Sequence, residues 1–88
     1  MFVILVYDVG LKRVAKVRKI AEKYLRPVQR SVFDGYLTDH NLAKLQEELE
    51  EQLDPEADAV TIYKQHEFTG EFSRLEIGKR PEMTGSIL

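Results

Sequence analysis

The sequence of 88 residues contains no cysteine and no tryptophan. The lack of cysteine excludes a disulfide framework and a thiolate metal site, so the chain needs no oxidising compartment. The apolar run from Phe2 to Tyr7 is far shorter than the roughly 20 residues that a membrane span needs. No basic leader precedes this run, so we expect neither a signal peptide nor a membrane anchor, and a cytoplasmic location.

Apolar side chains make up 43% of the chain and charged side chains 32%, which is typical of one small globular domain and excludes a multidomain enzyme. A domain of this size buries only about 60% of the surface that its unfolded chain exposes. Its core is therefore small, and we expect oligomerisation to extend it.

Hydrophobic periodicity divides most of the chain into alternating strands and helices. Apolar residues at helical spacing predict amphipathic helices over 11–25 and 38–53, which end before Pro27 and Pro55. Thr38 or Asp39 is the expected cap of the second helix. Short runs rich in β-branched and aromatic residues predict strands over 2–7, 28–33, 59–63 and 72–77. Asp34-Gly35 favours a hairpin turn to a short strand at 36–37, with one long bulged strand as the alternative.

This order predicts an α/β (α+β) domain of the ferredoxin-like βαββαβ type with an added C-terminal strand over residues 1–78. Two helices can cover only one face of such a sheet, yet the strand 2–7 is apolar on both faces. We therefore expect a homodimer packed sheet to sheet, with the edge strand 72–77 pairing with the partner's sheet. Residues 79–88 are expected to form an extended tail, either frayed or ordered on a partner protein.

Charge is divided along the chain. Residues 1–44 carry nine Lys/Arg against four Asp/Glu, a net charge of +5, whereas residues 45–88 carry four against eleven, a net charge of −7. Eight cations lie between Lys12 and Arg30. Such a stretch is either a solvated helix face or, doubled in a dimer, a band that binds the phosphate backbone of a nucleic acid. The acidic run from Glu47 to Asp58 is expected to be a solvated helix end.

Asp8 places a carboxylate at the carboxyl end of the strand 2–7, where open sheets often bind ligands. Two interpretations remain open at this point. Asp8 either caps the first helix, or it meets its copy across a dimer axis, so that the two carboxylates hold one hard divalent cation. His40 and His66 lack partners at metal-ligand spacing, and we expect both to be surface residues.

Three segments together carry a resemblance to a known family. They are the strand that ends in Tyr7-Asp8 before a basic helix, the run Val28-Gln29-Arg30-Ser31-Val32-Phe33-Asp34-Gly35-Tyr36-Leu37-Thr38, and Asp54-Pro55-Glu56-Ala57-Asp58 before a β-branched strand. In these segments the sequence resembles the CRISPR-associated Cas-two proteins of the spacer-acquisition machinery. The resemblance implies a ferredoxin-like homodimer that shares a divalent-metal site, Mg²⁺ or Mn²⁺, between its two copies of Asp8.

The resemblance leaves two functions open. One is a metal-dependent endonuclease that cleaves RNA or double-stranded DNA, with Asp8 as the catalytic metal ligand and with Tyr7, Ser31 and Phe33 supporting the site. The other is a non-catalytic duplex-DNA adaptor that scaffolds the CRISPR integrase, the Cas-one protein, in antiviral defence. Both imply nucleic-acid contacts by a set of basic residues: Lys12, Arg13, Lys16, Lys19 and Arg30. A small dimer without a nucleic-acid role is the third possibility, should the motif match be chance.

Overall fold

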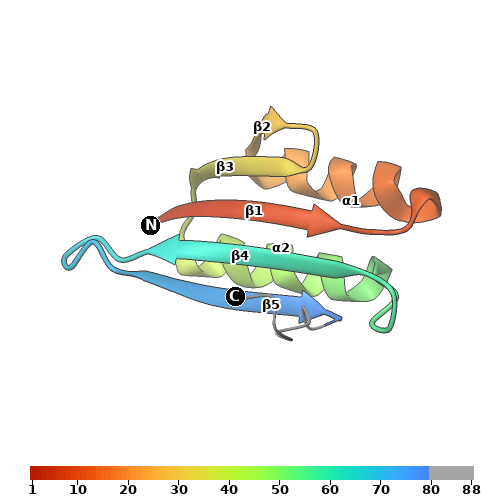
Figure 1. Ribbon diagram of the computed structural model, residues 1–88. Coiled ribbons are helices and arrows are strands. Elements are labelled where there is room, and N and C mark those ends of the chain that lie inside the picture. The colour runs from red at the N-terminus through yellow and green to blue at the C-terminus, as the bar shows by residue number, and fades with distance from the viewer. Residues whose placement is uncertain (80–88) are drawn as a thin grey trace, which may run out of the picture.

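A computed structural model of the protein describes residues 1–79 of the chain (Figure 1). The elements follow in the order β1 (Phe2–Asp8), α1 (Leu11–Tyr24), β2 (Arg26–Gln29), β3 (Val32–Tyr36), α2 (Asp39–Gln52), β4 (Ala59–Gln65) and β5 (Phe72–Gly78). The strands form one antiparallel sheet in the order β2-β3-β1-β4-β5. The first six elements have the ferredoxin-like βαββαβ arrangement, and β5 is the added strand, which confirms the predicted fold class.

Both helices lie behind the sheet in Figure 1, so the core forms between the helices and one sheet face. Along β1, Val3, Leu5 and Tyr7 point into this core and are buried. Their partners across the layer are the apolar stripes of the two helices. These stripes consist of Val17, Ile20 and Ala21 in α1 and Leu42, Leu45 and Leu49 in α2.

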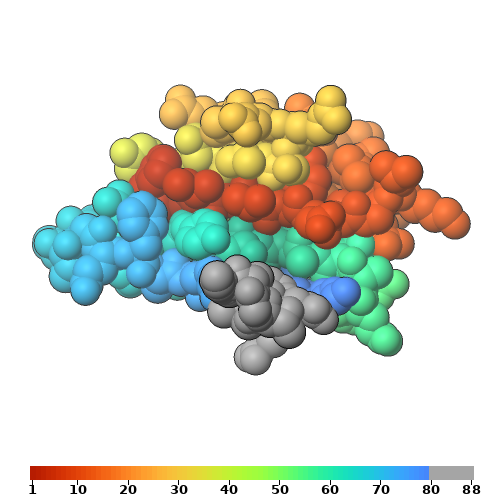
Figure 2. Space-filling model, in the orientation of Figure 1, coloured from red at the N-terminus to blue at the C-terminus, as the bar shows by residue number. Residues whose placement is uncertain are grey.

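The opposite sheet face carries no helix among residues 1–79, and we call it the open face (Figure 2). Phe2, Ile4 and Val6 of β1 lie on this face and are only half-buried. The ring of Phe2 packs on that of Tyr36 with centroids 5.3 Å apart, and Tyr36 is 80% exposed. One small domain therefore presents a row of large apolar side chains on its uncovered side.

The predicted helix boundaries are confirmed. Thr38 caps α2, since its Oγ1 accepts a hydrogen bond of 3.1 Å from the Asn41 backbone N–H. Leu25 follows α1 in an extended conformation, one residue before the Arg26-Pro27 pair that opens β2. Within residues 1–79, neither helix has the length and apolar character to cross a membrane.

The predicted turn at Asp34-Gly35 is wrong. Both residues lie inside β3, and the hairpin turn falls at Arg30-Ser31, with a register shift between Pro27 and Gln29 in β2. Gly35 packs closely against Leu25 here: a Cβ on it would lie 3.1 Å from Leu25 Cδ2, so a larger residue would require Leu25 to shift. The long single strand considered as an alternative is also wrong.

β5 lies at the edge of the sheet, and its expected pairing with the partner's sheet remains a prediction. β5 pairs along its whole length with β4 of its own chain, from Ala59 opposite Gly78 to Gln65 opposite Phe72. The connecting loop is short and is closed by backbone hydrogen bonds of 2.9 Å from His66 N–H to Glu71 O and from Gly70 N–H to His66 O. A hairpin this local has a small loop-closure cost. The predicted tail beyond residue 79 lies outside the described part of the chain.

Candidate active site and nucleic-acid interface

Asp8 ends β1 on the open face, opposite Ala59 of β4, and its side chain is exposed. Within residues 1–79 its carboxylate makes no hydrogen bond or ion pair with protein. The N-cap of α1 is Gly10, and no side chain caps this helix. The interpretation of Asp8 as a helix cap is therefore wrong, and its oxygens are available to a ligand.

The turn between β2 and β3 lies beside the same end of β1. The Tyr7 backbone N–H donates to Ser31 O at 3.1 Å, and the Tyr7 hydroxyl donates to Arg30 O at the same distance. Arg18 Nη1 also donates to Arg30 O, at 3.4 Å. The structure thus brings Ser31 and Arg30, two of the predicted site residues, next to the strand that carries Asp8.

Tyr7 and Phe33 support this end of the sheet from within the core. Phe33 is fully buried and Tyr7 is 7% exposed, with ring centroids 6.2 Å apart. The Arg18 guanidinium lies over the Phe33 ring, 5.7 Å from its centroid. The aromatic residue of the Val32-Phe33 motif therefore acts by packing and cannot touch a substrate directly.

Asp58 is the feature of the site that sequence reasoning missed. Its side chain is fully buried immediately before β4, although the acidic run to which it belongs is expected to be solvated. Oδ1 accepts hydrogen bonds from Gly10 N–H at 2.8 Å and from Arg13 Nη2 at 3.0 Å. Oδ2 accepts from Asp54 N–H at 2.9 Å and forms an ion pair with Arg13 Nε.

These four donors determine the charge state of Asp58. The hydrogen bonds from Arg13 hold the pKa of the Asp58 carboxyl well below its usual range, with the Asp54 and Gly10 amides adding to the effect against the opposing effect of burial. The same hydrogen bond raises the pKa of Arg13. Arg13, predicted as a nucleic-acid contact, therefore has its guanidinium engaged by protein, with 28% of its side chain exposed.

The remaining predicted cations of α1 form one exposed stripe: Lys12, Lys16 and Lys19. Lys16 and Lys19 share a shallow groove of about 280 Å³ with Glu48 and Glu51 of α2. Further along, Lys23 forms an ion pair with Glu48, which also accepts a hydrogen bond from the Tyr24 hydroxyl. These contacts lower the pKa of Glu48. The basic stripe of α1 thus borders an acidic stripe of α2, which limits the width of any nucleic-acid contact on this face.

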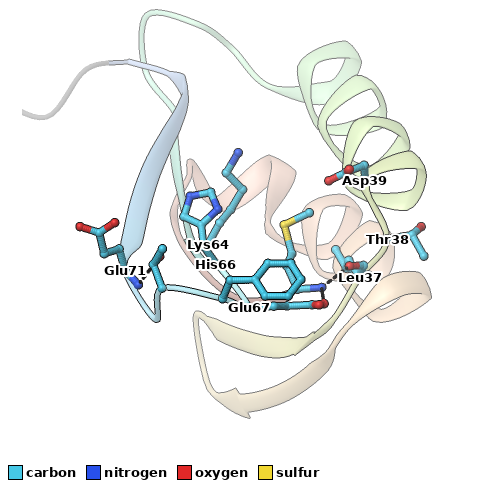
Figure 3. A pocket seen from close by; sticks show the side chains of 10 residues that line it. Leu37, Thr38, Asp39, Lys64, His66, Glu67 and Glu71 are labelled. Carbon is cyan, nitrogen blue, oxygen red and sulfur yellow. Dashed lines mark hydrogen bonds and ion pairs between the residues drawn. The ribbon is translucent and has the colours of Figure 1, made fainter.

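A separate cleft of about 780 Å³ lies at the opposite end of the sheet from Asp8 (Figure 3). Lys64, His66, Glu67 and Asp39 are among the residues that line it. The amino group of Met1 bridges its wall, with a 2.9 Å hydrogen bond to Leu37 O and a 3.3 Å ion pair with Glu67. Both histidines are exposed, as expected, and no group of three or more metal-ligating side chains occurs within residues 1–79.

Comparison with known proteins identifies the family. The sequence profile of the family described as CRISPR associated protein Cas2 matches residues 1–69. The chain belongs to this family. It is 41% identical over 87 residues to the CRISPR-associated endoribonuclease Cas2 3 of Thermodesulfovibrio yellowstonii, covering 99% of this chain and 98% of the relative. It is 49% identical over 63 residues to the CRISPR-associated endoribonuclease Cas2 of Thermotoga maritima, covering 72% of each chain.

Solved structures agree with this assignment. The crystal structure of Streptococcus pyogenes Cas2 superposes with a TM-score of 0.70 at 27% identity, covering 77% of this chain and 89% of that one. Asp8, the turn at Arg30-Ser31 and the buried Asp58 all lie within the 69 residues matched by the Cas2 profile, whereas β5 lies beyond them. The candidate site is therefore built entirely from the part of the chain that defines the family.

Proposed function

We propose that this protein is a metal-dependent endoribonuclease of CRISPR spacer acquisition that acts as a homodimer. The observation that carries the proposal is Asp8, an exposed carboxylate without a protein partner among residues 1–79, held at the end of a rigid central strand. Support comes from relatives of 41% and 49% identity that are named endoribonucleases.

The dimer follows from the open face. Ile4 and Val6 lie there in the same row as Asp8, and the exposed ring of Tyr36 packs on Phe2 at the other end of this row. Apolar side chains on an uncovered sheet face gain free energy when a second layer covers them, and a second copy of the chain supplies one. A two-fold axis near the ends of the β1 strands would bring the Asp8 carboxylates of two copies to one place.

The donor set of such a site fits a hard divalent cation. One carboxylate oxygen from each copy leaves room for the several water molecules that Mg²⁺ normally retains, and Mn²⁺ accepts the same ligands. Once bound, such an ion lowers the pKa of a water ligand and so supplies a hydroxide nucleophile at neutral pH. The chain itself contributes Asp8 to hold the site, and Arg30 and Ser31 beside β1 to orient a phosphodiester.

The test is cleavage of single-stranded RNA and of duplex DNA by wild type and by Asp8→Asn, each with Mg²⁺, Mn²⁺ or EDTA. We expect EDTA to abolish RNA cleavage and Asp8→Asn to lower its rate by about 100-fold or more, because a metal ligand is removed. Asp39→Asn, a matched change at the exposed start of α2, should leave the rate unchanged. Cleavage that survives in Asp8→Asn, or in EDTA, would refute the proposal.

The exposed Lys stripe of α1 favours a second candidate function, a duplex-DNA adaptor that scaffolds the CRISPR integrase. Lys12, Lys16 and Lys19 present three charges along one helix face, a pattern that suits phosphate contact without base readout. In this case Asp8 is dispensable. Asp8→Ala would then bind duplex DNA and capture the integrase as wild type does, and neither protein would cleave RNA in Mg²⁺.

A further inference from the structure

Asp58 and Arg13 form a buried clamp directly behind the loop that follows Asp8. The Asp58 carboxylate has no exposed surface, and each of its oxygens accepts hydrogen bonds from two donors. Those donors come from two separate segments of chain, because Gly10 and Arg13 belong to the start of α1, whereas Asp54 lies in the α2–β4 loop.

The clamp holds Gly10 at both of its backbone polar groups. The Gly10 N–H donates to Asp58 Oδ1 at 2.8 Å, and the Gly10 carbonyl accepts from Arg13 N–H at 2.9 Å. The guanidinium packs closely on this glycine: a Cβ here would lie 2.6 Å from Arg13 Nη2, so a larger residue would displace the Arg13 side chain. Only Val9 separates this fixed residue from Asp8, so the path of the chain out of β1 is determined by the clamp.

The clamp is also anchored to β4. Asp8 pairs with Ala59, the first residue of β4, and Asp58 immediately precedes Ala59, so the two aspartates lie at the same end of the sheet. Asp58 thus fixes the loop after Asp8 from one side while the β1–β4 ladder fixes Asp8 from the other. A shift of the clamp would shift the direction in which the Asp8 carboxylate leaves the strand.

We propose that Arg13 and Asp58 are positioning residues that orient Asp8 for metal binding and cleavage, and that Arg13 is not a phosphate contact. This inference rests on the proposed function of Asp8. Arg13, the most buried cation of α1, then has a different role from Lys12, Lys16 and Lys19. These three lysines have no ion-pair partner within residues 1–79.

The test compares Arg13→Gln, Asp58→Asn and the double variant, after circular dichroism has verified folding of each. We expect each single variant to lower kcat for RNA by about 10- to 100-fold, as is usual for groups that orient a metal ligand, with KM and the salt dependence of RNA binding unchanged. The double variant should be no worse than the worse single one, because both changes break the same clamp. Lys44→Gln, which removes an exposed charge from α2, is the control and should match wild type.

Two readouts separate this inference from the proposed function. In both single variants, amide exchange at Gly10 should accelerate about 10-fold or more, since its acceptor is weakened, and Mn²⁺ should broaden the Asp8 resonances less than in wild type. A wild type that does not cleave RNA would refute the proposed function, while amide exchange would still decide the positioning role. Unchanged Gly10 exchange, additive effects in the double variant, or a raised KM with a flatter salt slope in Arg13→Gln would each overturn the inference.

Discussion

Replacing Asp58 by alanine should destabilise the fold strongly, because it leaves several buried or half-buried donors without an acceptor. In the variant, the Arg13 guanidinium and the backbone N–H groups of Gly10 and Asp54 lose the carboxylate to which they donate. Removing one partner of a buried ion pair typically costs about 3–5 kcal/mol of unfolding free energy. We expect about 3 kcal/mol, at the low end, because 28% of the Arg13 side chain is exposed and can recover some hydration.

The pH dependence of this destabilisation has a defined sign. The pKa of Asp58 in the folded protein lies well below its ordinary value of 3.8, so folding favours the ionised form. The stabilisation is therefore complete above about pH 5 and declines as the pH falls below the ordinary value, by about 1.4 kcal/mol per pH unit. Between pH 6 and pH 2.5 the difference in unfolding free energy between wild type and Asp58→Ala should shrink by about 2 kcal/mol.

Urea unfolding at one fixed protein concentration measures both effects, since unfolding of a dimer depends on concentration. If the unfolding free energy falls by about 1 kcal/mol per M urea, the urea midpoint of Asp58→Ala at pH 6 should lie about 3 M below that of wild type. Asp54→Ala, an exposed aspartate in the same loop, is the matched control and should change stability by less than about 1 kcal/mol. A destabilisation by Asp58→Ala below about 1 kcal/mol, or a gap that does not narrow at pH 2.5, would refute the reasoning.

Two further predictions concern the surfaces. Ile4→Glu places a charge in the middle of the open face, so light scattering should find the variant monomeric at micromolar concentration where wild type is dimeric; a dimeric variant would move the interface elsewhere. Charge removal at Lys16 and Lys19 should reduce the slope of log affinity for duplex DNA against log salt concentration by about 0.9 for each phosphate that the variant no longer neutralises. Glu51→Gln should instead strengthen DNA binding, because it removes an acidic side chain from the groove that Lys16 and Lys19 line. Unchanged slopes in both variants would place the DNA-binding surface elsewhere on the protein.

Periodicity predicted most of the fold because its signals are local. The alternation of β1, the leucine stripe of α2 and the cap at Thr38 each depend on a few neighbouring residues, and all three are as expected. The turn at Asp34-Gly35 was mispredicted for a non-local reason. Gly35 lies inside β3 with Leu25 packed closely against it, and no pattern in the hairpin itself reveals that proximity.

The candidate site also combines residues with local sequence signals and residues whose role depends on non-local contacts. Asp8 was recognised because a carboxylate directly after an apolar strand is a pattern visible within eight residues. Asp58 was not, because it stands in an acidic run and its partner Arg13 is 45 residues away. The one signal in the sequence was its position immediately before the apolar strand 59–63, which places it at the edge of the core and in need of compensating donors.

The contrast between Asp8 and Asp58 explains how a small domain keeps one carboxylate available at the end of a packed sheet. The amide of Gly10 could in principle serve either aspartate, since this residue begins α1 two positions after Asp8. Asp58 accepts the hydrogen bond from that amide. Together with the donors of Arg13 and Asp54, this hydrogen bond compensates the carboxylate charge of Asp58, which could not otherwise be buried. The loop after Asp8 is thereby fixed without using the oxygens of Asp8 itself. Those oxygens face outward from a rigid strand, which is the arrangement that binding an ion there would require.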